Sequence, residues 1–296
     1  MQFVDEQDRV LCSTDLVHDG FDPFLELASI LCPGDHHRQV QDHDTAVEEQ
    51  FRDIAADDAL GEAFHDRRQA VMDGAEAKAK ALGFDVVFKR TYPAKVTDLT
   101  PLLSDLKAAD AEIVIGGGHF QDGQLMNKQM ADLDINPKLL SLIAAATLPA
   151  FGEALGDLAE GVMGPSHWEY GVTFSNEGAE KLGMTWIGPS QDEYVALFKK
   201  AVGKDMLPDY HAAEASAAVL ALVLAVEKVD SVDNDKVRAA LGDLAFMSFY
   251  GGWDIDDTGK QVGHSMVDVQ WQKGERKIVW PEAAQTAAPV YPKKKF

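Results

Sequence analysis

Short apolar runs alternate with amphipathic segments along residues 66–168, and this alternation restricts the fold more than any other feature. The runs FDVVF, AEIVIGGG, KLLSLIAA and EGVMGPSHW predict strands near residues 84–88, 112–116, 138–143 and 160–165. Strands and helices that alternate at short intervals are typical of a parallel sheet with helices packed on it. The sequence therefore predicts an α/β fold with doubly wound parallel sheets.

Amphipathic segments fill the intervals between these runs. A helix that includes Ala75 and Leu82 on one face is expected to end at Gly83, because glycine favours the conformation that closes a helix. The next helix carries leucines at the i, i+3, i+4 and i+7 spacing of a face buried on one side, and these are Leu99, Leu102, Leu103 and Leu106. Two further helices are predicted near residues 122–133 and 148–155.

The later part of the chain has a different pattern. Ser190 and Glu193 form a capping-box pattern at the start of a helix. Residues 212–226 are almost wholly apolar over about four turns, a length too short to span a bilayer, so we expect a helix buried inside the protein. Alternating residues around 257–259 and 273–274 predict two β-hairpins near the C-terminus.

Charge and length exclude several classes of protein. Acidic side chains outnumber basic ones by 49 to 27, which gives a formal net charge of −22. We therefore expect neither nucleic acid nor direct membrane insertion, because phosphate groups would repel the chain and no apolar stretch reaches the length of a membrane span. The opening residues are acidic where an export signal carries lysine or arginine, so no export signal is recognisable.

Residues 1–65 differ from the rest. They contain none of the lysines and carry 16 acidic residues against three arginines. Their apolar periodicity is also poor. We predict an irregular N-terminal segment that packs poorly, and the sequence leaves open whether it is a native extension or an aberrant stretch.

The glycine-rich segment GGGHFQDG follows a predicted strand and precedes a predicted helix. Gln121 replaces the third glycine of a dinucleotide-binding fingerprint, and Gln124 and Leu125 replace the Lys and Ser/Thr of a P-loop. Glycines at a strand end still let a ligand approach the backbone amides of the following helix. The segment is either a ligand-lining loop or a plain tight turn.

Catalytic motifs do not stand out. No serine lies in a G-x-S-x-G elbow, and the histidine and cysteine spacing matches no zinc pattern. We therefore predict that the chain is not an enzyme and uses no cofactor or metal ion.

From about Arg67 onward the chain resembles the type I periplasmic-binding-protein family, in particular the branched-chain amino-acid (Leu/Ile/Val-type) substrate-binding proteins of ABC importers. The matching blocks keep their order, and they are DGAEAKAKALGFDVVF, EIVIGGGHFQDGQLMNKQM, TLPAFGEALGDLAEGVMGPSHW, PDYHAAEASAAVLALVLAVEK, GGWDIDDTGKQVGHSMVDVQWQ and WPEAAQTAAPVYP. The resemblance implies two α/β lobes with a ligand cleft between them. Residues 66–168 and 263–296 then correspond to the second lobe, and residues 169–262 to the remnant of an incomplete first lobe.

The resemblance also implies a site. Its ligand-binding residues would be Gly117, Gly118, His119, Phe120, Ala144, Trp168 and Tyr210. The acidic residue that pairs with the α-ammonium of amino-acid ligands in the family falls near Ala144. Because a buried ammonium without a counter-charge is costly, we expect a neutral or anionic solute rather than a free amino acid.

Function follows from the resemblance as an expectation. The chain would be the solute-binding protein of an ABC importer, with a permease and ATPase complex as partners, in the periplasm or another extracytoplasmic space. Its solute would be small and polar: a branched-chain amino acid, an amide or a related molecule. A cytoplasmic ligand-sensing regulator of the same fold remains an alternative, and a small-molecule α/β hydrolase a weaker one.

Overall fold

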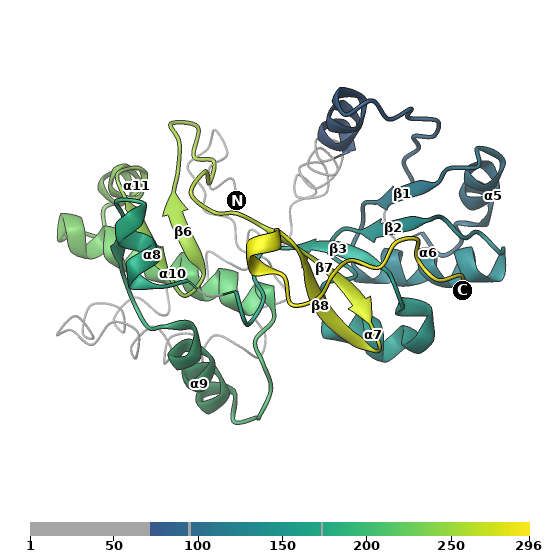
Figure 1. The fold of residues 1–296 in the computed structure, drawn as a ribbon. Coiled ribbons are helices and arrows are strands. Elements are labelled where there is room, and N and C mark those ends of the chain that lie inside the picture. The colour runs from purple at the N-terminus through teal and green to yellow at the C-terminus, as the bar shows by residue number, and fades with distance from the viewer. Residues whose placement is uncertain (1–71, 94–95, 173) are drawn as a thin grey trace. The chain divides into compact units, whose positions relative to one another are not determined.

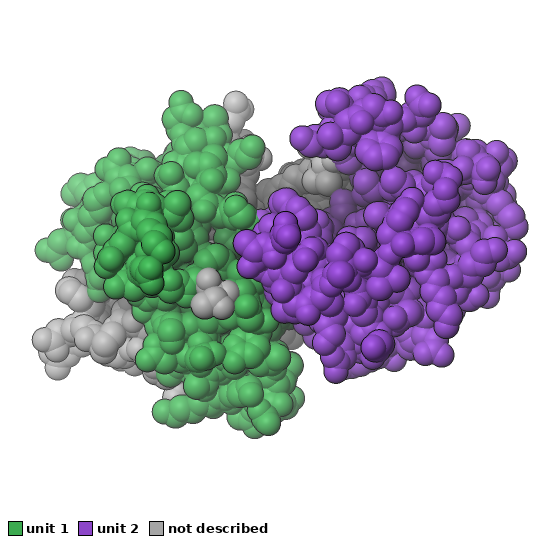
Figure 2. All heavy atoms as spheres, viewed as in Figure 1, with its two compact units in different colours: residues 1–57, 167–265 green, residues 58–166, 266–296 purple. Residues whose placement is uncertain are grey.

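The computed structural model describes residues 72–93, 96–172 and 174–296, so the predictions for residues 1–65 lie outside the described residues. The described chain forms two compact units, which are coloured separately in Figure 2. Unit 1 contains His167–Ser265, and unit 2 contains residues 72–166 together with Met266–Phe296.

Unit 2 is built on a five-stranded sheet with the order β1-β2-β3-β7-β8 (Figure 1). The strands are β1 (Ile113–Gly116), β2 (Leu139–Leu142), β3 (Met163–Ser166), β7 (Val267–Gln272) and β8 (Glu275–Trp280). Strands β1 to β3 run parallel, and β7 and β8 add antiparallel strands, so the sheet is mixed. Three of the four strands predicted in residues 66–168 are confirmed.

The strand predicted at residues 84–88 is wrong. Within the described part of the chain this segment pairs with no strand, and Phe84 and Val87 are 52% and 60% exposed. Valine and phenylalanine favour strands only where they pack on a pleated surface beside a partner strand. Phe88 alone in this segment packs partly against the core of unit 2.

Helices α5 (Thr100–Ala108), α6 (Phe120–Asp132) and α7 (Pro149–Leu155) supply the rest of the core of unit 2, with the short turns η2 (Gly156–Ala159) and η3 (Glu282–Ala284) beside the strands. Val114, Leu140 and Leu142 face these helices from the sheet. On the opposite face of β1, Ile113 and Ile115 are 38% and 43% exposed.

A further helix covers residues 72–81, and Gly83 closes it with a φ of +84°, as the sequence predicts. Leu82 is 62% exposed, so the expected apolar face of this helix is not buried. The exposed Leu82 and the unpaired segment 84–88, which both differ from the prediction, are adjacent in sequence. Gly83 keeps its role because a cap depends on local backbone geometry rather than on burial.

The leucine pattern of α5 leads to a stability prediction. Leu103 is fully buried, whereas Leu102 is only partly buried against the same core. Leu103→Ala is expected to lower the free energy of unfolding by about 2–5 kcal/mol, because it leaves a cavity among neighbours that cannot fully collapse. Leu102→Ala is the matched control and should cost clearly less. Urea unfolding of both variants tests the ranking, and equal costs would contradict the packing of α5.

The described part of unit 1 is an α/β unit with a three-stranded sheet in the order β4-β5-β6. Its strands are β4 (Thr185–Trp186), β5 (Ala245–Ser248) and β6 (Gly251–Asp254), and its helices are α8 (Asn176–Lys181), α9 (Gln191–Val202), α10 (Tyr210–Val229) and α11 (Asn234–Gly242). The predicted capping box of α9 is confirmed: the Ser190 hydroxyl accepts from the Glu193 amide at 3.3 Å, and the Glu193 carboxylate accepts from the Ser190 amide at 2.8 Å.

Helix α10 is buried on one face only, which corrects the prediction of a helix wholly inside the protein. Its buried residues are Tyr210, Ala213, Ser216, Ala217, Leu220, Ala221 and Ala225, whereas Leu222 is 47% exposed. An apolar sequence predicts burial, but neighbouring elements decide how much of it is achieved. Of the helices the structure describes, none is long and apolar enough to cross a membrane.

The C-terminal hairpins form at the predicted turns. Lys273 and Gly274 have φ of +56° and +76°, so they make the tight two-residue turn between β7 and β8. The turn at residues 257–259 is closed by a single bridge between Ile255 and Gln261. Gly259 has a φ of +81° in this turn.

Candidate functional site

The carboxyl ends of β1 and β2 bring five of the predicted site residues to one edge of the sheet in unit 2. The two strands are parallel neighbours, with Gly116 opposite Leu142. The Ile143 amide continues the ladder by donating to the Gly116 carbonyl at 2.9 Å. Gly117–Phe120 therefore leave β1 beside the turn that carries Ala144, at the edge where parallel sheets bind ligands.

Close packing explains the glycines that follow β1. A β-carbon on Gly118 would lie 2.4 Å from the Tyr92 hydroxyl oxygen and 2.9 Å from Asp122 Oδ2. A β-carbon on Gly117 would lie 3.1 Å from Met72 Sδ. The Tyr92 hydroxyl donates to the Gly117 carbonyl at 2.6 Å. The strand end is thus packed so tightly that only glycine fits at position 118.

His119 caps helix α6. Its backbone amide donates to Asp122 Oδ2 at 3.1 Å, and its side chain accepts from the Asp122 amide, which together make a capping box. His119 is exposed, while Phe120 is half-buried against the core of unit 2. Asp122 is only 8% exposed, so a carboxylate is held at this edge of the sheet.

Ala144 adopts an uncommon backbone conformation, with a φ of +63°. A residue with a β-carbon pays a steric cost in this left-handed region, and such strain is concentrated at functional sites in proteins. The Thr147 hydroxyl donates to the Ala144 carbonyl at 3.4 Å within the same turn. The Ala145 β-carbon lies against Gly123 in the first turns of α6, which joins the Ala144 turn to the glycine loop.

Trp168 and Tyr210 belong to unit 1. Trp168 is 3% exposed, and its indole N–H donates to the Phe249 carbonyl at 3.1 Å. Tyr210 is 7% exposed and its ring stacks with the imidazoles of His167 and His211, at centroid distances of 5.4 and 4.0 Å. Both aromatic side chains therefore contribute to packing in unit 1, and their contact with a ligand stays a prediction.

Two histidines lie at the ends of the unit 1 segment. The His264 Nε2–H group donates to the His167 carbonyl at 2.7 Å, because a carbonyl can only accept. The His264 ring also stacks on Tyr250 at 4.4 Å. Burial lowers the pKa of His167 and the pKa of His264 below 6.5. Burial thus favours the neutral form of both imidazoles.

The two lowered values predict acid sensitivity. The unfolded chain binds protons at these imidazoles as the pH falls through about 6.5, whereas the folded chain resists them, so stability is retained above that pH and lost below it. The melting temperature of the wild type should therefore fall between about pH 7.5 and about pH 5.5. The melting temperature of the double variant His167→Gln, His264→Gln should fall less over the same pH range, relative to its own melting temperature at the higher pH. An unchanged fall would contradict the prediction.

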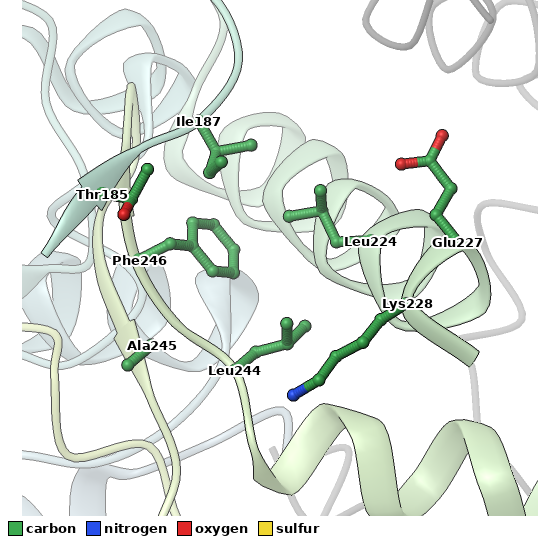
Figure 3. Close-up of a pocket in the computed structure, with 8 residues that line it drawn as sticks. All are labelled: Thr185, Ile187, Leu224, Glu227, Lys228, Leu244, Ala245 and Phe246. Atoms are coloured by element: carbon green, nitrogen blue, oxygen red, sulfur yellow. The ribbon is translucent and has the colours of Figure 1, made fainter.

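Figure 3 shows a pocket of about 460 Å³ in unit 1. It is lined by Thr185, Ile187, Leu224, Glu227, Lys228, Leu244, Ala245 and Phe246. Leu224 and Phe246 point toward each other across it. The Lys228 ammonium donates to the Asp243 carbonyl at 3.2 Å. The pocket shares no residue with the predicted site, and its walls are mainly apolar.

The described chain contains two α/β units, and the strand edge of unit 2 carries five of the residues that the sequence predicts for a site. A sequence model of the family described as periplasmic binding protein matches residues 60–276. The chain therefore belongs to the periplasmic binding protein family. The type I fold and the resemblance to branched-chain amino-acid binding proteins expected from the sequence are confirmed.

Relatives and solved structures agree with this assignment. Leu/Ile/Val-binding protein homolog 7 of Brucella abortus (strain 2308) is 26% identical over 215 residues, which are 71% of this chain and 51% of that protein. A leucine binding protein from Thermotoga maritima MSB8 superposes with a TM-score of 0.55 at 21% identity, over 68% of this chain and 53% of that one. A solute binding protein of an ABC transporter from R. palustris, in complex with benzoate, superposes with a TM-score of 0.57 at 16% identity, over 73% of this chain and 55% of that one. The chain spans about half the length of the curated relatives it matches.

Sequence reasoning missed two side chains at the strand edge. Tyr92 reaches Gly117 from 25 positions earlier in the chain, and no local pattern predicts that contact. Asp122 was visible in the motif GGGHFQDG as an acid three residues after a potential cap, which is the capping-box signal.

Proposed function

We propose that this chain binds a small polar solute at the carboxyl edge of β1 and β2 and serves as the solute-binding protein of an ABC importer outside the cytoplasm. The observation that carries the proposal is the adjacency of the tightly packed Gly117–Gly118 loop and the strained Ala144 turn. We retain the assignment of residues 66–168 and 263–296 to the second lobe, and of residues 169–262 to the first, as part of this proposal.

The physical argument is one of rigidity. The polar backbone groups that follow β1 are fixed by the Tyr92 contact and by the α6 cap. A site with fixed polar groups binds without paying for their ordering. Family membership supports a binding role, since the family and fold are those of substrate-binding proteins.

The names of the relatives suggest which solutes to try. Brucella relatives are named Leu/Ile/Val-binding protein homologs, a Streptococcus pneumoniae neighbour is described in complex with isoleucine, and the R. palustris neighbour in complex with benzoate. Leucine, isoleucine, valine, small amides and benzoate therefore form the first panel.

Calorimetric titration of this panel tests the proposal. We expect one solute class to bind the wild type and to bind Gly118→Ala at least tenfold more weakly, because a β-carbon there displaces Tyr92 or Asp122. Gly74→Ala is the matched control, since a β-carbon at Gly74 meets nothing within 4 Å. His119→Ala provides a second variant if Gly118→Ala folds poorly by circular dichroism. Binding that neither substitution changes would contradict the site.

The importer role needs its own test. A permease and an ATPase are the partners that the proposal requires, and they should be encoded beside this chain. Solute uptake by cells that express the permease and ATPase should depend on this chain. Uptake at the same rate without it would contradict the importer role while leaving the solute site intact.

A further inference from the structure

His264 links the two chain segments that leave unit 1. The chain passes between the units after Ser166 and again after Ser265. In unit 2 these segments belong to β3 and β7, where Ser166 lies opposite Val267 in the end pair of the ladder. In unit 1 the His264 Nε2–H group donates to the His167 carbonyl at 2.7 Å. A side chain therefore joins the two segments directly beyond the point where their backbone pairing ends.

The His264 ring fits closely against unit 1. It stacks on the Tyr250 ring with centroids 4.4 Å apart and planes inclined by 14°. A β-carbon on Gly251 would lie 2.8 Å from His264 Nδ1. A β-carbon on Gly252 would lie 2.3 Å from the carbonyl oxygen of Gly263, the residue before the histidine. The two glycines at the start of β6 thus leave room for the segment that carries this ring.

One nitrogen of the ring has no hydrogen-bond partner. Because Nε2 carries the hydrogen that it donates, Nδ1 of the neutral ring is an acceptor. Nδ1 is buried, and it forms no hydrogen bond with the described part of the chain. Protonation of His264 would place a positive charge and a new N–H donor at this position. The ring therefore becomes charged at a high cost in place, or at a low cost after it has moved out into water.

The groups that face the ring leave this cost in place. Burial has the largest influence and lowers the pKa of His264 below 6.5. The hydrogen bond to the His167 carbonyl and the carboxylate of Glu214, on α10, act to raise the pKa, whereas the His167 imidazole acts to lower it. Tyr250 stays neutral near this pH, because burial raises its pKa. Opening is thus favoured as the pH falls through about 6.5, because the open state binds the proton more readily.

We propose that His264 is an acid-released latch. The neutral ring holds residues 261–265 against β6 and against the segment that follows β3. Protonation moves the ring out of its place, breaks the link to the His167 carbonyl and frees both segments where the chain leaves unit 1. The population of the open state should rise by up to about tenfold for each pH unit below about 6.5, because opening takes up one proton. The latch does not depend on the proposed solute site.

Hydrogen exchange of the Val262 and Gly263 amides tests the latch. Both amides donate to the Asp254 carbonyl, at 2.7 and 3.1 Å, so they report whether the segment before His264 stays on β6. In the wild type we expect their protection factors to fall about five- to tenfold between about pH 7.5 and about pH 5.5. The amides of α11, which packs on α10 elsewhere in unit 1, should change less than about twofold.

Three variants assign the response to one ring. His264→Gln removes the titrating group but keeps an N–H that can donate to the His167 carbonyl, so the protection factors should change less than about twofold over the same pH range. His167→Gln keeps the backbone carbonyl that His264 uses, and it should retain the response. His211→Gln is the matched control, because it removes an exposed imidazole that stacks on Tyr210, and it should respond as the wild type does.

Nitrogen NMR of the wild type is a second measurement, which needs no variant to fold. The His264 ring should be the Nε2–H tautomer at about pH 7.5 and should reach half-protonation only below about pH 6.5. A wild type without the fall in protection, or a fall that persists in His264→Gln or disappears in His167→Gln, overturns the proposal. A His264 ring that is half-protonated at or above about pH 6.5 also overturns it.

Discussion

Trp271→Ala is expected to lower the free energy of unfolding of unit 2 by about 3–5 kcal/mol. The indole is 5% exposed, and its N–H donates to the Ala146 carbonyl at 2.7 Å. Its ring fills the space above Gly152, where a β-carbon would lie 2.2 Å from it, and it packs beside Phe151. The substitution therefore creates a large cavity and leaves a buried carbonyl without its donor.

The matched control for this prediction is Trp280→Ala on the neighbouring strand β8. Trp280 is 58% exposed, so its loss should change stability by no more than about 0.5 kcal/mol. Guanidinium unfolding followed by circular dichroism compares the two. Equal losses from Trp271→Ala and Trp280→Ala would contradict the packing of β7 against α7.

Phe249→Ala is expected to lower the stability of unit 1 by about 3–5 kcal/mol. Phe249 is fully buried and stacks on Tyr194 with ring centroids 3.9 Å apart. Trp168 meets the same tyrosine edge-on at 6.0 Å and donates to the Phe249 carbonyl. Loss of the phenylalanine ring removes the centre of this aromatic cluster.

Hydrogen exchange can show that the stability lost in Phe249→Ala is lost from unit 1. Amides of α9 and α10 should lose protection in Phe249→Ala, because they pack around the cluster through Tyr194 and Ser216, which share a hydrogen bond at 3.2 Å. Leu182→Ala, at a residue 67% exposed, is the control and should leave protection unchanged. Unchanged exchange in α9 and α10 of Phe249→Ala would contradict the prediction.

Local patterns predicted those elements that depend on neighbours in sequence. Leu99, Leu103 and Leu106 are buried because a helix with that spacing has one apolar face, whichever surface it meets. The same holds for the α9 capping box and the turn before β8, which are fixed by a few adjacent residues. The strand predicted at residues 84–88 does not form, because a strand needs a neighbouring strand to pair with, and local sequence does not determine whether one is there.

The candidate site also has features that the sequence could predict and features that it could not. Gly117 and Ala144 could be placed together because they follow strands expected to be parallel, and parallel neighbours end at the same edge. The positive φ of Ala144 could not be foreseen, since alanine does not favour it. The contact of Tyr92 with Gly118 required the packed structure, because it is one of atoms in contact rather than of sequence spacing.

A crystal structure of the chain with its tightest-binding panel solute tests the central claim most directly. The account predicts solute density at the carboxyl edge of β1 and β2, in contact with Gly117, Gly118 and the Ala144 turn. Solute bound instead in the apolar pocket between Leu224 and Phe246, with the strand edge of unit 2 untouched, would contradict the account.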